Sequence, residues 1–173
     1  SLEAIRLGGK FLARAAKDPD DHEARHMLML AATMAGLSFG NAGVHLPHAM
    51  SYGVAGLCHK WTAKGYEKAK PMVPHGIAVV LNAPCAFRFT AAAAPERHLK
   101  AAEALGADVS NAAPEHGGEL LAGRLIEMMR ETGLPNGTGE LGFTEADIPE
   151  LVKRGYNQPR LVILAPRDVT EDD

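Results

Sequence analysis

The feature that most restricts how this chain can fold is the long stretch from Met27 to Cys58, which contains no Asp, Glu, Lys or Arg. A run of this length can span a bilayer, but Asn41, His45 and His48 lie inside it and several glycines interrupt it. We therefore predict helices buried in the core of a globular domain. A membrane-inserted helical hairpin is the alternative.

The composition is that of one ordinary domain, with 173 residues, 46% apolar, 23% charged and a net charge of -3. No run of Lys and Arg provides a positive field, so we expect neither nucleic acid nor a membrane surface as a partner. Cys58 and Cys85 lack a CxxC spacing and are expected to be buried free thiols, typical of the cytoplasm. No signal peptide is expected, because Arg6, Lys10 and Arg14 interrupt the first apolar stretch.

Helical periodicity recurs along the chain and strand patterns are few, so we predict a single all-α domain over residues 1–173. The expected helices cover 2–17, 22–38, 74–94, 95–105 and 115–132, and a short one follows Thr144. Pro84 should kink or end its helix, and Thr144 with Asp147 resembles a weak capping box. The basic and polar composition of residues 59–71 predicts an exposed connection. The secondary structure of the apolar run 160–164 stays ambiguous.

The patterns at both ends of the sequence indicate that the chain was cut from a longer one. A helix begins at once after Ser1, and residues 170–173 have the composition of a helix start with no helix after it. Removal of neighbouring segments would expose apolar surface, so we expect a homo-oligomer or an aggregation-prone monomer.

Three histidines, His45, His48 and His75, lie in uncharged segments where each ring needs a partner. His48 and Tyr52 lie one helical turn apart, and a histidine from a second helix, such as His75, would complete a pair of imidazole ligands for zinc or Fe(II). A hydrogen-bonded core position is the alternative for each ring. The other histidines, expected at the surface, are His22, His26, His59, His98 and His116.

Five blocks of the sequence, taken in order, resemble one family: GNAGVHLPHAMSY, VPHGIAVVLNAP, PERHLKAAEALGAD, DIPELVKRG and ILAPR. They are similar to the iron-containing alcohol dehydrogenases, and within these to the hydroxyacid-oxoacid transhydrogenase branch. The resemblance implies a two-domain enzyme, with an N-terminal α/β domain that binds NAD(P) and a C-terminal helical domain that carries most ligands of a divalent metal. This chain matches only the helical domain, so we expect the chain alone to be inactive and to bind metal weakly or not at all.

Residue by residue, the resemblance implies that His48 and His75 are metal ligands, whereas the family's earlier Asp and His have no counterpart here. Tyr52 stands where many members carry another histidine, and it is implied to be a catalytic residue that donates a hydrogen bond to a substrate oxygen. A phenol relays protons less well than an imidazole at neutral pH. Arg88 is a candidate partner for an anionic substrate, although a surface or structural role is favoured.

The metal implied is Fe(II) or zinc, and the implied substrate is a small alcohol or hydroxyacid. The location would be cytoplasmic, or mitochondrial in a eukaryote. The alternative function is a non-enzymatic helical interaction domain in which the histidines are core residues.

Overall fold

The computed structural model describes residues 1–67 and 70–173, and within these ranges the chain is helical without a named strand, which confirms the all-α prediction. The α-helices are α1 (Leu2–Lys17), α2 (His22–Ala42), α3 (Leu46–Leu57), α4 (His75–Ala91), α5 (Pro95–Leu105), α6 (Gly117–Glu131), α7 (Ile148–Tyr156) and α8 (Pro159–Val162). Short 3-10 helices cover Pro114–His116, Thr138–Leu141 and Glu145–Asp147.

The contacts divide the chain into two compact units. The first unit comprises Ser1–Gly43 and Phe87–Gly133, and the second comprises Val44–Ala86 and Leu134–Asp173. Helix α4 contributes residues to both units. The prediction of one domain over residues 1–173 stays a prediction.

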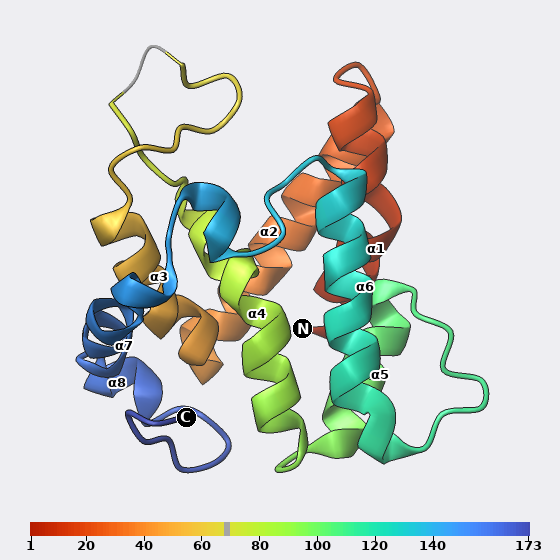
Figure 1. Ribbon diagram of the computed structural model, residues 1–173. Coiled ribbons are helices and arrows are strands. Elements are labelled where there is room, and N and C mark those ends of the chain that lie inside the picture. Colours follow the sequence, from red (N-terminus) through yellow and green to blue (C-terminus); the bar gives the residue numbers. More distant parts are fainter. Residues whose placement is uncertain (68–69) are drawn as a thin grey trace. The chain divides into compact units, whose positions relative to one another are not determined.

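In the first unit, α1 packs against α2 and α5, and α5 packs against α6 (Figure 1). Its core cluster is formed by Ala102, Leu105, Leu121 and Met128. The approach of α1 to α5 depends on Gly9, because a Cβ atom at this position would lie 2.5 Å from the carbonyl oxygen of Leu105. A side chain there would force the helices apart.

Asp21 fixes the start of α2. Its carboxylate accepts a hydrogen bond from the Ala24 backbone N–H at 2.9 Å and another from the Arg14 guanidinium at 2.9 Å. These two bonds lower the pKa of Asp21. The helix runs past the predicted end at residue 38 to Ala42, and it stops at Gly43, whose φ of 73° suits a glycine.

The prediction that the whole uncharged stretch is buried is wrong for α2. Only Ala24 and Ala31 of this helix are buried, while Met29 and Leu37 are 70% and 69% exposed. The reason is that α1 covers one side of α2 and leaves an apolar side uncovered. Within the described ranges no single helix is long and apolar enough to cross a membrane, and only α2 with α3, taken as a broken pair, meets that test of length and composition.

In the second unit, α3 is largely buried, as predicted, and packs against α7 and α8. Small residues bring α3 and α7 close together, since a Cβ atom on Gly53 would lie 3.0 Å from the Leu151 carbonyl oxygen. The capping box at Thr144 and Asp147 is confirmed, with the Asp147 carboxylate accepting from the Thr144 backbone N–H at 2.7 Å. The ambiguous run resolves into α8 and the turn that follows it.

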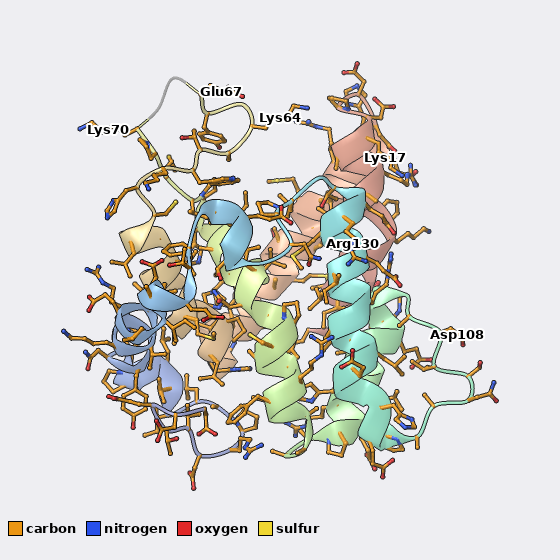
Figure 2. The ribbon with its side chains drawn as sticks, viewed as in Figure 1. Lys17, Lys64, Glu67, Lys70, Asp108 and Arg130 are labelled. Atoms are coloured by element: carbon orange, nitrogen blue, oxygen red, sulfur yellow. The ribbon has the colours of Figure 1, made fainter. Side chains whose placement is uncertain are left out.

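The described residues of the connection between α3 and α4 are largely exposed, as predicted, and Figure 2 shows Lys64, Glu67 and Lys70 along it. Positions 68 and 69 of the predicted connection lie outside the described residues. The prediction for the cysteines is half right, because both thiols are free and Cys58 is buried, but Cys85 is exposed. Pro84 does not end its helix, since α4 continues through it to Ala91.

Candidate metal centre

Both predicted metal ligands lie in the second unit, each in the first turn of a helix. His48 lies in the first turn of α3, where its backbone N–H donates to the carbonyl oxygen of His45 at 2.9 Å. His75 is the first residue of α4 and follows Pro74, whose carbonyl oxygen accepts from a backbone N–H of that helix. The starts of two helices therefore present one imidazole each.

The structure brings the two rings together. The centroids of His48 and His75 lie 5.3 Å apart, and the ring planes are inclined by 57°. Two imidazoles on one tetrahedral metal, each with its nitrogen about 2.0–2.1 Å from the ion, have centroids roughly 5 Å apart. The spacing of this pair therefore fits two ligands of a single ion.

The electrostatics of His48 also suit a ligand. The pKa of His48 lies below its ordinary value, first because the half-buried ring loses solvation and second because a charged His75 repels its proton. The neutral imidazole is the form that binds metal, so this environment keeps the lone pair of His48 available near neutral pH.

The donor set of this pair is small. Among residues 1–67 and 70–173 no group of three or more His, Cys, Asp or Glu side chains is arranged to hold a metal ion. Two imidazoles suit both zinc and Fe(II), so the residues present fit part of the coordination shell of either ion.

Tyr52 follows His48 by one turn of α3 and is 43% exposed. Its phenol oxygen accepts a hydrogen bond from Nη2 of Arg160 at 3.2 Å. Arg160 was not predicted from the sequence. The available signal was that no acidic residue stands three or four positions to either side of it, where a helical ion pair would form.

The remaining histidines are mostly where the sequence placed them. His45 is the N-cap residue of α3 and is half-buried, and the exposed rings are His22, His26, His59 and His116. The surface prediction is wrong for His98, which is 9% exposed. The turn after α4 sets its ring between the Thr90 hydroxyl at 3.0 Å and the Ala94 carbonyl oxygen at 2.8 Å, and these groups satisfy both ring nitrogens.

Arg88 has the structural role that the sequence favoured. Its guanidinium donates two hydrogen bonds to the Glu119 carboxylate, at 2.5 and 2.7 Å, and so links α4 to α6 within the first unit. The same bonds lower the pKa of Glu119. Arg88 is therefore engaged in holding the fold rather than offered to a substrate.

Comparison with known proteins identifies the family. Residues 1–173 match the model of the Fe-containing alcohol dehydrogenase family, C-terminal. The chain belongs to the iron-containing alcohol dehydrogenase family. It corresponds to the C-terminal domain of these enzymes, which is the helical domain that the sequence resemblance implied.

The similar relatives are hydroxyacid-oxoacid transhydrogenases. The mitochondrial protein of Bos taurus is 46% identical over 173 residues, and that of Xenopus tropicalis is 46% identical over 170 residues, which cover 100% and 98% of this chain. The chain spans 37% of the length of each relative. Among solved structures, a 1,3-propanediol oxidoreductase superposes with a TM-score of 0.84 at 25% identity, over 99% of this chain and 41% of the other.

Proposed function

We propose that this chain is the metal-binding helical part of an NAD(P)-dependent oxidoreductase that acts on small hydroxyacids and oxoacids, and that His48 and His75 hold its divalent metal. The observation that carries the proposal is the 5.3 Å separation of the two rings. The family supports a metal and a nicotinamide nucleotide, and the names of the relatives support the substrate class.

The two histidines would supply neutral nitrogen ligands from the starts of two different helices, α3 and α4. α3 is held by its contacts with α7 and α8, whereas His75 sits at the end of the exposed connection. When bound, the metal would supply Lewis-acid chemistry at a reacting oxygen, and NAD(P) would supply hydride-transfer chemistry.

Tyr52 has the proposed role of orienting the substrate. A phenol has one hydrogen to donate and two lone pairs to accept with. Because the oxygen of Tyr52 accepts from Arg160, its own hydrogen stays available for a substrate oxygen. Tyr52→Phe would remove this donor while keeping the ring. It should lower kcat/KM of the complete enzyme and leave the free energy of unfolding nearly unchanged.

The isolated 173-residue chain should not turn over NAD(P). Catalytic metal sites generally use at least three protein ligands, and the described ranges bring only two together here. We expect the metal to bind this chain more weakly than it binds the complete enzyme, and to be lost readily.

The experiment that tests the proposed function is an assay of the complete enzyme with 4-hydroxybutyrate as hydride donor and 2-oxoglutarate as acceptor. The unaltered enzyme should convert both, and His48→Ala and His75→Ala should each abolish the conversion and lower the metal content. His116→Ala, which alters an exposed ring on another unit, should leave both unchanged. Conversion that survives both ligand substitutions would refute the assignment.

For the location of the protein, we propose the mitochondrial option when the source is a eukaryote. The similar relatives are mitochondrial enzymes. Cell fractionation followed by immunodetection tests this, and a purely cytosolic signal would contradict it.

A further inference from the structure

We propose that Arg160 binds the carboxylate of the substrate and so selects hydroxyacids and oxoacids over neutral alcohols. This inference rests on the proposed function, because it assigns a residue to the substrate end of the same site. It starts from the hydrogen bond between the Arg160 guanidinium and the phenol of Tyr52, which places a cation beside the helix face that carries His48.

The charge of Arg160 is not neutralised by the protein. Several other arginines of the chain are paired with carboxylates, for example Arg88 with Glu119, Arg124 with Glu131 and Arg154 with Glu150. In the part of the chain that the structure describes, no carboxylate lies within ion-pair distance of Arg160, and its side chain is exposed. An anion supplied from solution would therefore meet an available cation.

The hydrogen bond to Tyr52 uses only part of the donor capacity of the guanidinium. This group carries five N–H groups in a planar fork, and Nη2 is engaged by the neutral oxygen of Tyr52. A carboxylate can accept two parallel hydrogen bonds from such a fork, which makes the contact both strong and directional. The neutral phenol positions the guanidinium and leaves its positive charge unpaired.

The spacing along α3 limits the size of the ligand. Tyr52 lies four residues after His48, close to one helical turn, which advances about 6 Å along the helix axis. A carboxylate held by Arg160 and a reacting oxygen near the His48–His75 pair would therefore belong to one molecule with only a few carbon atoms between them. Short hydroxyacids and oxoacids meet this description, whereas a neutral alcohol offers no anion to the guanidinium.

The first test compares two substrates of equal length in the complete enzyme, 4-hydroxybutyrate, which carries a carboxylate, and 1,4-butanediol, which does not. Arg160→Gln should raise KM for the acid by about 10- to 100-fold, the loss expected for a hydrogen bond to a charged group, and change KM for the diol much less. Arg160→Lys should give an intermediate KM, because it keeps the charge but not the fork. Arg154→Gln is the matched control, since it removes a charge from the same unit that is already paired, and it should change neither value.

The second test does not depend on turnover. In the 173-residue chain, the Nε–H signal of Arg160 is followed by NMR during titration with 4-hydroxybutyrate and then with 1,4-butanediol. The acid should shift this signal and the diol should not. If the ratio of KM for 4-hydroxybutyrate to KM for 1,4-butanediol is the same in Arg160→Gln and in the unaltered enzyme, the proposal is overturned. An Arg160 signal that does not shift when the acid is added would also overturn it. If the enzyme converts neither substrate while the acid still shifts Arg160, the proposed function fails and the anion site stands.

Discussion

The rings of His48 and His75 lie with their centroids 5.3 Å apart, although the long exposed connection between α3 and α4 separates them in sequence. Two imidazoles this close repel each other when both are protonated, and they attract a cation when both are neutral. The pair therefore suits half of the coordination shell of a metal ion. The proton affinity of its rings can be measured.

The first prediction concerns the pKa of His48. In the metal-free chain, an NMR titration of the ring protons should place it below the ordinary value of about 6.5. His75→Ala should raise it part of the way back, because burial remains while the repulsion is removed. Since the folded value is lowered, the contribution of His48 to stability is complete above about pH 6.5 and declines as the pH falls toward the folded pKa. A His48 titration that His75→Ala leaves unchanged would contradict the contact.

The second prediction concerns two adjacent glycines in α1. Gly9→Ala should lower the free energy of unfolding by about 1–3 kcal/mol, because the new Cβ atom meets backbone atoms of Leu105. Gly8 has nothing within 4 Å of its Cβ position, so Gly8→Ala should instead stabilise the helix by about 0.5–1 kcal/mol. Urea unfolding of both variants measures the difference, and changes of the same sign would show that α1 and α5 are not this close.

The third prediction concerns the pair formed by Arg88 and Glu119. Both side chains are substantially exposed, so at neutral pH Glu119→Gln should cost no more than about 1 kcal/mol of unfolding free energy. The pKa of Glu119 is lowered in the folded chain, so the stabilisation is present above the unfolded pKa of about 4.3 and is lost as the pH falls through the folded value. Urea unfolding should show a larger difference between variant and unaltered chain at pH 7 than at pH 3, and a difference of equal size at both pH values would argue against the pair.

The fourth prediction concerns the exposed apolar side of α2. We propose that the 173-residue chain forms a homo-oligomer through this side, and Met29→Gln combined with Leu37→Gln should weaken the association seen by analytical ultracentrifugation. Ile163→Gln is the control, because Ile163 is 81% exposed and follows α8 in the other unit. A dilute monomer before any substitution would rule this out.

Much of the fold was predictable because local signals decide it. The bounds of α1 and α5 and the capping box at Thr144 follow from apolar periodicity and terminal residues. The end of α2 was not predictable in the same way, since Gly36 and Gly40 weaken a helix without having to stop it. The burial of α2 was misjudged because composition gives the polarity of a segment and not what packs against it.

The candidate site was predictable only in part. The positions of His48 and His75 came from the family resemblance, and the uncharged segments around them gave a physical reason to look there. Arg160 was missed because its contact with Tyr52 joins α3 to α8 and leaves no periodic trace in the sequence. His98 was misplaced for a related reason, since its partner Thr90 belongs to the preceding helix.

The measurement that tests the central claim most directly is zinc binding by the 173-residue chain at neutral pH, followed by competition with a coloured chelator. The unaltered chain should bind zinc at one site, and His48→Ala and His75→Ala should each remove that site while His116→Ala does not. Lowering the pH below about 6.5 should release the metal as the imidazoles protonate. Zinc binding that is unaffected by loss of both histidines would contradict the account and favour a helical interaction domain with core histidines.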